Sequence, residues 1–131
     1  MPGERNLELL LRGLAPVLDD TPFAFSTMPI GTVMPDGVRV VGTFSEAEGL
    51  SLIAPLADLA AAGLPHSASM AKISLEVHSS LEAVGLTAVI ATALTKAGIS
   101  ANVVAAYHHD HVFVPWDRRE EALRRLAELS T

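Results

Sequence analysis

The sequence of 131 residues predicts an α+β protein in which helices cover one face of an antiparallel sheet. Its length fits about one ordinary domain, or two very small units that share burial. Half of the residues (50%) are hydrophobic but only 5% are aromatic, so the core is expected to be aliphatic. Helical and strand patterns of apolar residues alternate along the chain, and a proline ends one strand in each half.

The first half opens with leucines at helical spacing. They recur at intervals of three and four over residues 7–18, and Asn6 can cap the start, so one helix is predicted there. Apolar β-type segments bounded by Pro and Gly follow, and then a short helix that Gly63 ends. These segments are predicted strands over residues 22–26, 38–44 and 50–54 and a predicted helix over residues 56–62.

The second half opens with alternating apolar and polar residues, which predict a strand over residues 72–78 with one face exposed to water. A helix, a hairpin and a second helix are expected after it. They are a helix over residues 85–97, strands over residues 99–107 and 111–114, and a helix over residues 117–129. Asp117 is expected to cap the last helix, with Glu120 three residues later completing a capping box.

The two halves repeat the same order of helix, strand, strand, proline and helix. Residues 1–65 and residues 66–131 are therefore predicted to be two copies of one unit, joined through the polar connector at 65–69. Each copy is too small to bury much apolar area alone, so the copies are expected to pack together or to share a sheet. A βαββα order with one hairpin and a crossover helix predicts a ferredoxin-like arrangement.

Composition and charge exclude several classes of protein. Fifteen Asp and Glu residues against nine Lys and Arg give a net charge of −6, which disfavours nucleic acid and anionic membranes as partners. The absence of cysteine excludes disulfides, thiolate zinc sites and cysteine nucleophiles. Neither a signal peptide nor an apolar run long enough to span a bilayer is recognisable, so a cytoplasmic protein is expected.

A dense polar cluster, Tyr107 to His111, occupies the predicted hairpin tip. Three interpretations stay open: a turn in which Asp110 binds backbone N–H groups, a contact to a ligand, or a metal site made by His108, His109, Asp110 and His111. Neighbouring strand residues point to opposite faces, so these side chains cannot all converge without help from the turn.

A second polar cluster lies where the strand at 72–78 leads into the next helix. Ser79, Ser80 and Gly85 there leave free backbone N–H groups that can bind an anion such as a carboxylate, although a helix cap with a packing glycine explains the same residues. Asn102 interrupts an apolar run, so it either satisfies a buried edge or contacts a ligand. Because no nucleophile motif or base geometry is present, no enzyme is expected.

The runs 73–88, 97–105 and 107–115 closely resemble a bacterial family of small tandem ACT-domain proteins, and residues 46–53 resemble its first-half motif. This resemblance implies two ACT-like βαββαβ units, related to the regulatory domains of aspartate kinase and to arginine-sensing ACT proteins. It also implies a non-catalytic protein that binds or senses an amino acid without a cofactor, and that forms a homodimer through sheet edges or helix faces.

The resemblance further implies a ligand site. Its residues are Ser79, Ser80, Val84, Gly85, Leu86, Asn102, Val103, His109 and Asp110. Backbone N–H groups near Val84 to Leu86 would hold the ligand carboxylate, Asn102 would orient it, and Asp110 would hold the ammonium group. Two alternatives stay open, namely a metal-binding protein or metal-dependent enzyme based on the cluster from His108 to His111, and an interaction module without a ligand.

Overall fold

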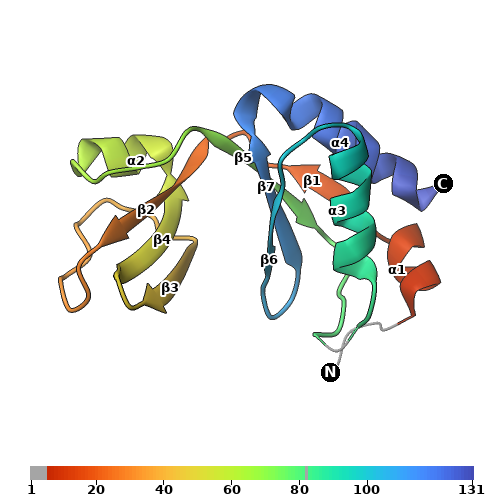
Figure 1. Cartoon of the computed structure of the whole chain (residues 1–131), viewed down its shortest axis with the longest axis horizontal. Helices are drawn as coiled ribbons and strands as arrows, with labels where there is room; N and C mark the ends of the chain where they lie inside the picture. Colours follow the sequence, from red (N-terminus) through yellow and green to blue (C-terminus); the bar gives the residue numbers. More distant parts are fainter. Residues whose placement is uncertain (1–5, 82) are drawn as a thin grey trace. The chain divides into compact units, whose positions relative to one another are not determined.

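The computed structural model describes residues 6–81 and 83–131, which form two compact units. Unit one combines the described residues up to Asp20 with Ala71–Thr131, and unit two is Thr21–Met70. Figure 1 labels the helices and strands of both units. Unit one is discontinuous in the sequence, because the first segment of the chain packs with residues 71–131.

The sheet of unit one contains four strands in the order β1–β5–β7–β6. They are β1 (Pro16–Leu18), β5 (Met70–Leu75), β7 (Asp110–Pro115) and β6 (Asn102–Ala105). Strand β1 runs antiparallel to β5, with Val17 opposite Ser74. Strands β6 and β7 form the predicted hairpin, with Ala105 opposite Asp110 beside the turn.

Three helices cover one face of this sheet: α1 (Leu7–Arg12), α3 (Leu86–Lys96) and α4 (Arg119–Ala127). Alternate residues of β5 and β7 point into the same buried core as these helices. This core includes Leu10 and Leu14, Ile73 and Leu75, Ile90 and Leu94, Val112 and Val114, and Leu126, all of them fully buried. The predicted aliphatic core and the predicted α+β class are thus confirmed.

The helix predicted over residues 7–18 is wrong beyond Arg12. Asn6 caps α1 as predicted, with its Oδ1 accepting the Leu9 N–H at 3.2 Å. Helix α1 ends at Gly13, Ala15 has a positive φ of 46°, and the chain then becomes β1. Pro16 explains the break, because proline disfavours helical geometry in the residue before it and has no N–H to donate.

Four other predicted elements also differ in the structure. The strand predicted over residues 72–78 is β5, which begins at Met70 and ends at Leu75. The strand predicted over residues 38–44 begins only at Gly42 and continues to Glu46, and the strand predicted over residues 99–107 shortens to β6. The predicted last helix is divided into a 3₁₀ turn, η1 (Trp116–Arg118), then α4, then a second 3₁₀ turn, η2 (Glu128–Ser130). Asp117 therefore lies inside η1, and no side chain caps the start of η1 or α4 in the part of the chain that the structure describes.

Unit two is a smaller antiparallel sheet in the order β3–β4–β2, covered by one short helix. Its elements are β2 (Phe23–Met28), β3 (Gly42–Glu46), β4 (Gly49–Pro55) and α2 (Leu56–Ala61). Its buried core consists of Ala24, Met28, Leu52, Ala54 and Leu59. At the start of β4, a Cβ on Gly49 would lie 3.0 Å from the carbonyl oxygen of Met28, so only glycine fits this turn without displacement.

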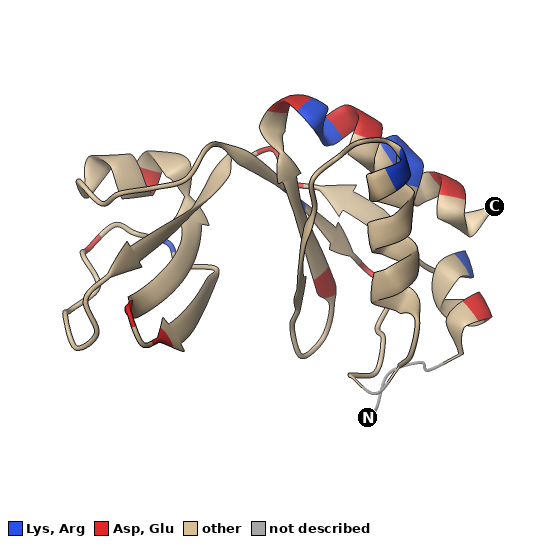
Figure 2. Ribbon diagram, viewed as in Figure 1, with Lys and Arg blue, Asp and Glu red and all other residues tan. Residues whose placement is uncertain are grey.

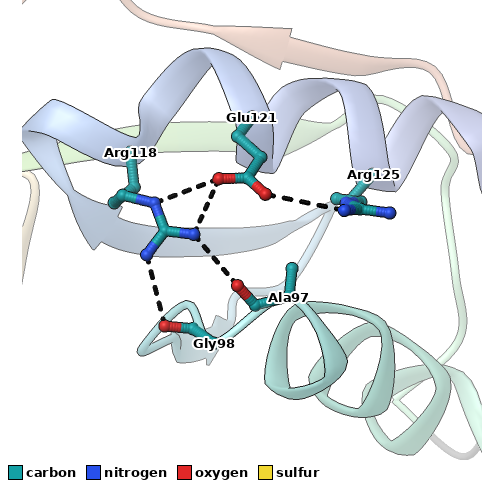
Figure 3. Close-up of polar contacts among 5 residues, drawn as sticks. All are labelled: Ala97, Gly98, Arg118, Glu121 and Arg125. Carbon is teal, nitrogen blue, oxygen red and sulfur yellow. Dashed lines mark hydrogen bonds and ion pairs between the residues drawn. The ribbon is translucent and has the colours of Figure 1, made fainter.

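One arginine joins the end of α3 to the start of α4 (Figure 3). The guanidinium of Arg118 donates to the carbonyl oxygens of Ala97 at 2.9 Å and Gly98 at 3.3 Å, and to Glu121 Oε1 at 2.7 Å. Arg125 lies on the other side of Glu121, at 3.6 Å from its Oε2. Because the last carbonyl groups of a helix lack partners within it, Arg118 satisfies two acceptors that would otherwise need water.

Arg118→Ala is expected to lower the free energy of unfolding by about 1–2 kcal/mol, the usual contribution of such hydrogen bonds. Hydrogen bonding and charge from Arg118 also lower the pKa of Glu121 in the folded protein. The ionised Glu121 therefore stabilises the folded state, and this contribution is lost as the pH falls from the usual Glu pKa of about 4.3 toward the lower pKa of the folded protein. Urea unfolding should therefore show a gap between wild type and variant that narrows below about pH 4.3. Arg124→Ala, an exposed position on α4, is the control, and a gap that stays constant with pH would contradict the role of Glu121.

None of the helices described in residues 6–81 and 83–131 has the length and apolar character needed to cross a membrane.

Candidate functional site

A small cavity of about 70 Å³ lies within unit one, where the loop after β5, the start of α3 and the β6–β7 hairpin meet. Eight residues line it: Ser79, Ser80, Leu81, Ala83, Leu86, Thr87, Ala105 and Asp110. The two polar clusters singled out in the sequence therefore meet at one place. The antiparallel pairing of β6 with β7 brings the hairpin residues to the cavity, since Ala105 and Asp110 lie opposite each other.

Among the described residues that line this cavity, Asp110 alone is charged, and it is only 8% exposed. As the first residue of β7 it shares a sheet face with Val112 and Val114, which point into the core beneath the helices. The hydroxyl of Ser79 donates to Asp110 Oδ2 at 3.1 Å. Among the described residues, no Lys or Arg forms an ion pair with it. A buried carboxylate without a countercharge is costly, and a cationic group bound in the cavity would remove that cost.

The start of α3 also lines the cavity, through Leu86 and Thr87. Gly85 precedes the helix with a φ of +98°, a left-handed conformation that favours glycine. A Cβ there would also lie 3.3 Å from Leu7 Cδ2 of α1. Because Leu86 and Thr87 line the cavity, the first-turn N–H groups of α3, which have no acceptor within the helix, lie beside it. The positive end of the helix dipole favours an anionic group at this position.

The structure brings four of the predicted site residues to the cavity, namely Ser79, Ser80, Leu86 and Asp110. Gly85 adjoins it as the residue before α3, and Val84 is 83% exposed to solvent. The other four lining residues, Leu81, Ala83, Thr87 and Ala105, fall outside the predicted set. The position of Ala105 depends on its pairing with Asp110 across the hairpin.

Two predicted residues on β6 lie elsewhere. Val103 packs against the core of unit one and does not line the cavity. Asn102 is exposed and, by the alternation of the strand, points to the sheet face opposite that of Val103. Its predicted role in orienting a ligand carboxylate therefore has no geometric support at this cavity.

The histidines at the hairpin tip point in different directions. His109 Nδ1 lies 3.4 Å from the Val77 carbonyl oxygen, and the His108 ring lies 5.8 Å from that of His78 between centroids. On the opposite sheet face, His111 Nδ1 is 2.8 Å from Ser74 Oγ. Burial lowers the pKa of His111, with further lowering by the charges of Lys72 and His109 and a smaller opposing effect of Asp110.

The different directions of these side chains do not favour a metal site made by the residues from His108 to His111. Asp110 points into the cavity under α3, whereas His111 lies on the other sheet face. Over the residues that the structure describes, no three His, Asp or Glu side chains are arranged so that they could hold a metal ion.

This chain is similar to several proteins of known structure. A Vibrio cholerae protein of unknown function, described as a possible transport protein, is 42% identical, with 95% of this chain and 96% of that chain covered and a TM-score of 0.84. The ligand-free regulatory subunit of aspartate kinase from Thermus thermophilus is 14% identical, with 87% and 95% covered and a TM-score of 0.59. Escherichia coli aspartokinase III, in complex with aspartate and ADP, is 11% identical, with 88% of this chain but 33% of that chain covered and a TM-score of 0.64.

The two aspartate kinase structures show that the fold is shared, and no more, at these identities. No curated protein sequence matches the chain. Residues 2–71 and residues 67–128 each match a family described as an ACT domain, and the two matches together span nearly the whole sequence. The chain therefore belongs to the ACT domain family, as a small protein with two ACT domains in tandem and the ferredoxin-like fold of aspartate kinase regulatory subunits.

Proposed function

We propose that this protein is a non-catalytic regulatory module that binds an α-amino acid at the cavity of unit one. The observation that carries the proposal is the carboxylate of Asp110, which is 8% exposed, lines a cavity and has no Lys or Arg partner among the described residues. Matches to ACT domains alone support a binding role rather than a catalytic one.

The two sides of the cavity have opposite electrostatic preferences, which suit a zwitterion. Asp110 would accept the ligand ammonium group, while Ser79 keeps its hydrogen bond to Oδ2 and holds the carboxylate in place. The first-turn N–H groups of α3 would bind the ligand carboxylate. Other predicted residues of this loop, Ser80, Val84 and Gly85, would shape the entrance, and His109 would buttress it from the hairpin.

The size of the cavity limits what can be buried. Its volume of about 70 Å³ lies far below the ~300–1,000 Å³ of pockets that enclose a whole ligand. Only the ammonium end of the amino acid would therefore be enclosed, and its side chain would extend past Leu81, which is 67% exposed. The proposal also includes a cytoplasmic location, which a cysteine-free composition supports, and self-association into a homodimer.

A thermal-shift screen of the full chain against the twenty amino acids tests the proposal. A ligand at one hundred times its Kd should add about 2.7 kcal/mol to the free energy of unfolding and raise the melting temperature accordingly. Two analogues of the best ligand serve as matched controls: the 2-hydroxy acid, which lacks the ammonium group, and the amino acid amide, which lacks the carboxylate. Both should stabilise much less.

Two results would count against amino-acid binding at this cavity. The first is the absence of stabilisation by every amino acid, which would favour an interaction module without a ligand. The second is equal stabilisation by the 2-hydroxy acid, because an analogue without an ammonium group cannot neutralise Asp110.

A further inference from the structure

The helical layer of unit one carries a second and larger hollow, a groove of about 480 Å³ along α3 and the end of the chain. Eight residues line it: Ala88, Val89, Thr92, Ala93 and Lys96 from α3, and Arg125, Glu128 and Leu129 from α4 and η2. It shares no residue with the amino-acid cavity. This surface is called the α3–α4 groove below, and its volume lies within the ~300–1,000 Å³ that is usual for sites of small ligands.

The base of the α3–α4 groove is apolar. Val89, Ala93 and Leu129 are half-buried there, and the exposed Ala88 extends the apolar surface toward the start of α3. From Ala88 to Lys96 the helix advances by about 12 Å. The groove therefore fits an elongated apolar body better than a compact polar one.

The charged residues of the α3–α4 groove carry an excess of positive charge. Lys96 and Arg125 are cationic and Glu128 is anionic, so the groove has a net charge of +1 in a chain whose net charge is −6. Lys96 is the last residue of α3, and Figure 2 shows the rest of this helix without charge. Among the described residues, Lys96 forms no ion pair. The groove therefore favours a ligand with one negative charge.

The guanidinium group of Arg125 is held toward the end of α3. Arg118 donates to Glu121 Oε1 at 2.7 Å and to the carbonyl oxygen of Ala97, the residue after Lys96, at 2.9 Å. The second oxygen of Glu121, Oε2, faces Arg125 at 3.6 Å (Figure 3). This separation is longer than a hydrogen bond, so the Arg125 guanidinium keeps N–H donors for a ligand.

Glu128, the anionic residue of the groove, lies away from the two cationic groups. Arg118 fixes the start of α4 beside the end of α3, and Glu128 follows about 15 Å further along the same helical segment. Arg125 is close to Glu128 in sequence, but its guanidinium reaches back toward Glu121 and the start of α4. The groove therefore has a cationic end beside the last turn of α3.

We propose that the α3–α4 groove is a second ligand site, which binds a small monocarboxylate with an elongated apolar body. The carboxylate would bind between Lys96 and Arg125, and the apolar body would lie over Val89, Ala93 and Leu129. Such a ligand matches both the single excess positive charge and the apolar base of the groove. The proposal goes beyond the proposed amino-acid site and does not depend on it.

An NMR titration of the full chain with octanoate tests the site, because backbone amide shifts report both the affinity and the place of binding. Octanoate should shift the amides of residues 88–96 and 125–129 and leave those of Ser79 and Asp110 unchanged. Octanol has a similar chain without the charge and should bind about tenfold more weakly. Acetate, which lacks the chain, should shift none of these amides.

Substitutions at the cationic end test the role of charge. Lys96→Ala and Arg125→Ala should each weaken octanoate binding about threefold, and the double variant about tenfold, because exposed ion pairs contribute modestly. Arg124→Ala is the matched control, since it removes an exposed cation of α4 that lies outside the groove. It should leave the affinity unchanged.

A bulky substitution tests the groove itself. Thr92→Trp places a large ring in the groove and should abolish octanoate binding. Thr95→Trp is its matched control, because Thr95 is exposed on the same helix but does not line the groove. The amide spectrum of each variant without ligand shows whether it has kept the fold.

Three results would overturn the proposal: octanoate shifts that are absent from the groove, equal affinity for octanol, or undiminished binding by folded Thr92→Trp. Asp110→Asn is titrated with octanoate in parallel and should bind it as wild type does, because Asp110 does not line the groove. Thr92→Trp should likewise keep the thermal-shift response to amino acids. These two cross-checks separate the sites, so a failure of one proposal is not mistaken for a failure of the other.

Discussion

Asp110→Asn is expected to weaken amino-acid binding by about 30-fold or more while leaving the unliganded protein at least as stable as wild type. Asparagine has nearly the shape of aspartate and can still accept the hydrogen bond from Ser79 Oγ. Removing a buried charge that lacks a countercharge relieves a desolvation cost in the unliganded protein. The ammonium group of the ligand, however, would lose its partner, which costs about 2–5 kcal/mol, or roughly 30-fold to several thousandfold in affinity.

Titration calorimetry for affinity and thermal melts with and without ligand measure the two effects separately. Asp117→Asn is the matched control, because it removes a carboxylate that is exposed in η1, away from the cavity. Ser79→Ala should give an intermediate loss of affinity, since it keeps the charge of Asp110 but removes its hydrogen bond. If Asp110→Asn melts well below wild type and still binds ligand, the carboxylate has a structural role only.

Leu10→Ala should cause one of the largest losses of stability of any single substitution in the chain, about 2–5 kcal/mol. Leu10 belongs to the short helix α1 near the start of the sequence, yet it is 0% exposed and lies in the core of unit one. Truncation would leave a cavity among residues of β5, β7, α3 and α4, which cannot all move to fill it. Chemical denaturation of the full chain measures the loss.

Leu9→Ala is the control for helix propensity, because Leu9 stands next to Leu10 in α1 but is 48% exposed. It should change the free energy of unfolding by only about 0.5 kcal/mol, the usual range for surface substitutions. Similar losses for the two variants would mean that α1 is not packed in the core of unit one. The pair thus tests directly whether the first segment of the chain belongs with residues 71–131.

Local sequence patterns predicted most of the fold because most of its elements have local signals. Helix α3 has its leucines and isoleucine on one face and Gly98 after its end, and Pro55 and Pro115 end the two equivalent strands. The leucine spacing of residues 7–18 predicted one helix that was too long. Leu10 and Leu14 do belong to the same buried core, but the helix ends between them. Pro16 is a local signal for the end of the helix, but the regular spacing of the leucines favoured a continuous helix.

The candidate site depends on contacts that a local pattern does not contain. Ser79 and Asp110 are 31 positions apart, and only the folding of the hairpin under α3 brings them together. Resemblance to ACT proteins predicted both residues, but it also predicted Asn102 beside them. The register of β6 against β7 places Asn102 opposite Phe113, whereas Ala105, three residues further along β6, lies opposite Asp110. Asn102 therefore lies on the other sheet face, away from the cavity.

The division of the chain into its two units sets an order for folding during synthesis. Unit two is continuous in the chain, so its strands and α2 can fold once Met70 has left the ribosome. Unit one is discontinuous, and β1 cannot pair with β5 until Leu75 is available opposite Pro16. Leu10 and Leu14 of the nascent chain therefore cannot make their core contacts with β5 until after unit two, the segment between them and β5, has been synthesised.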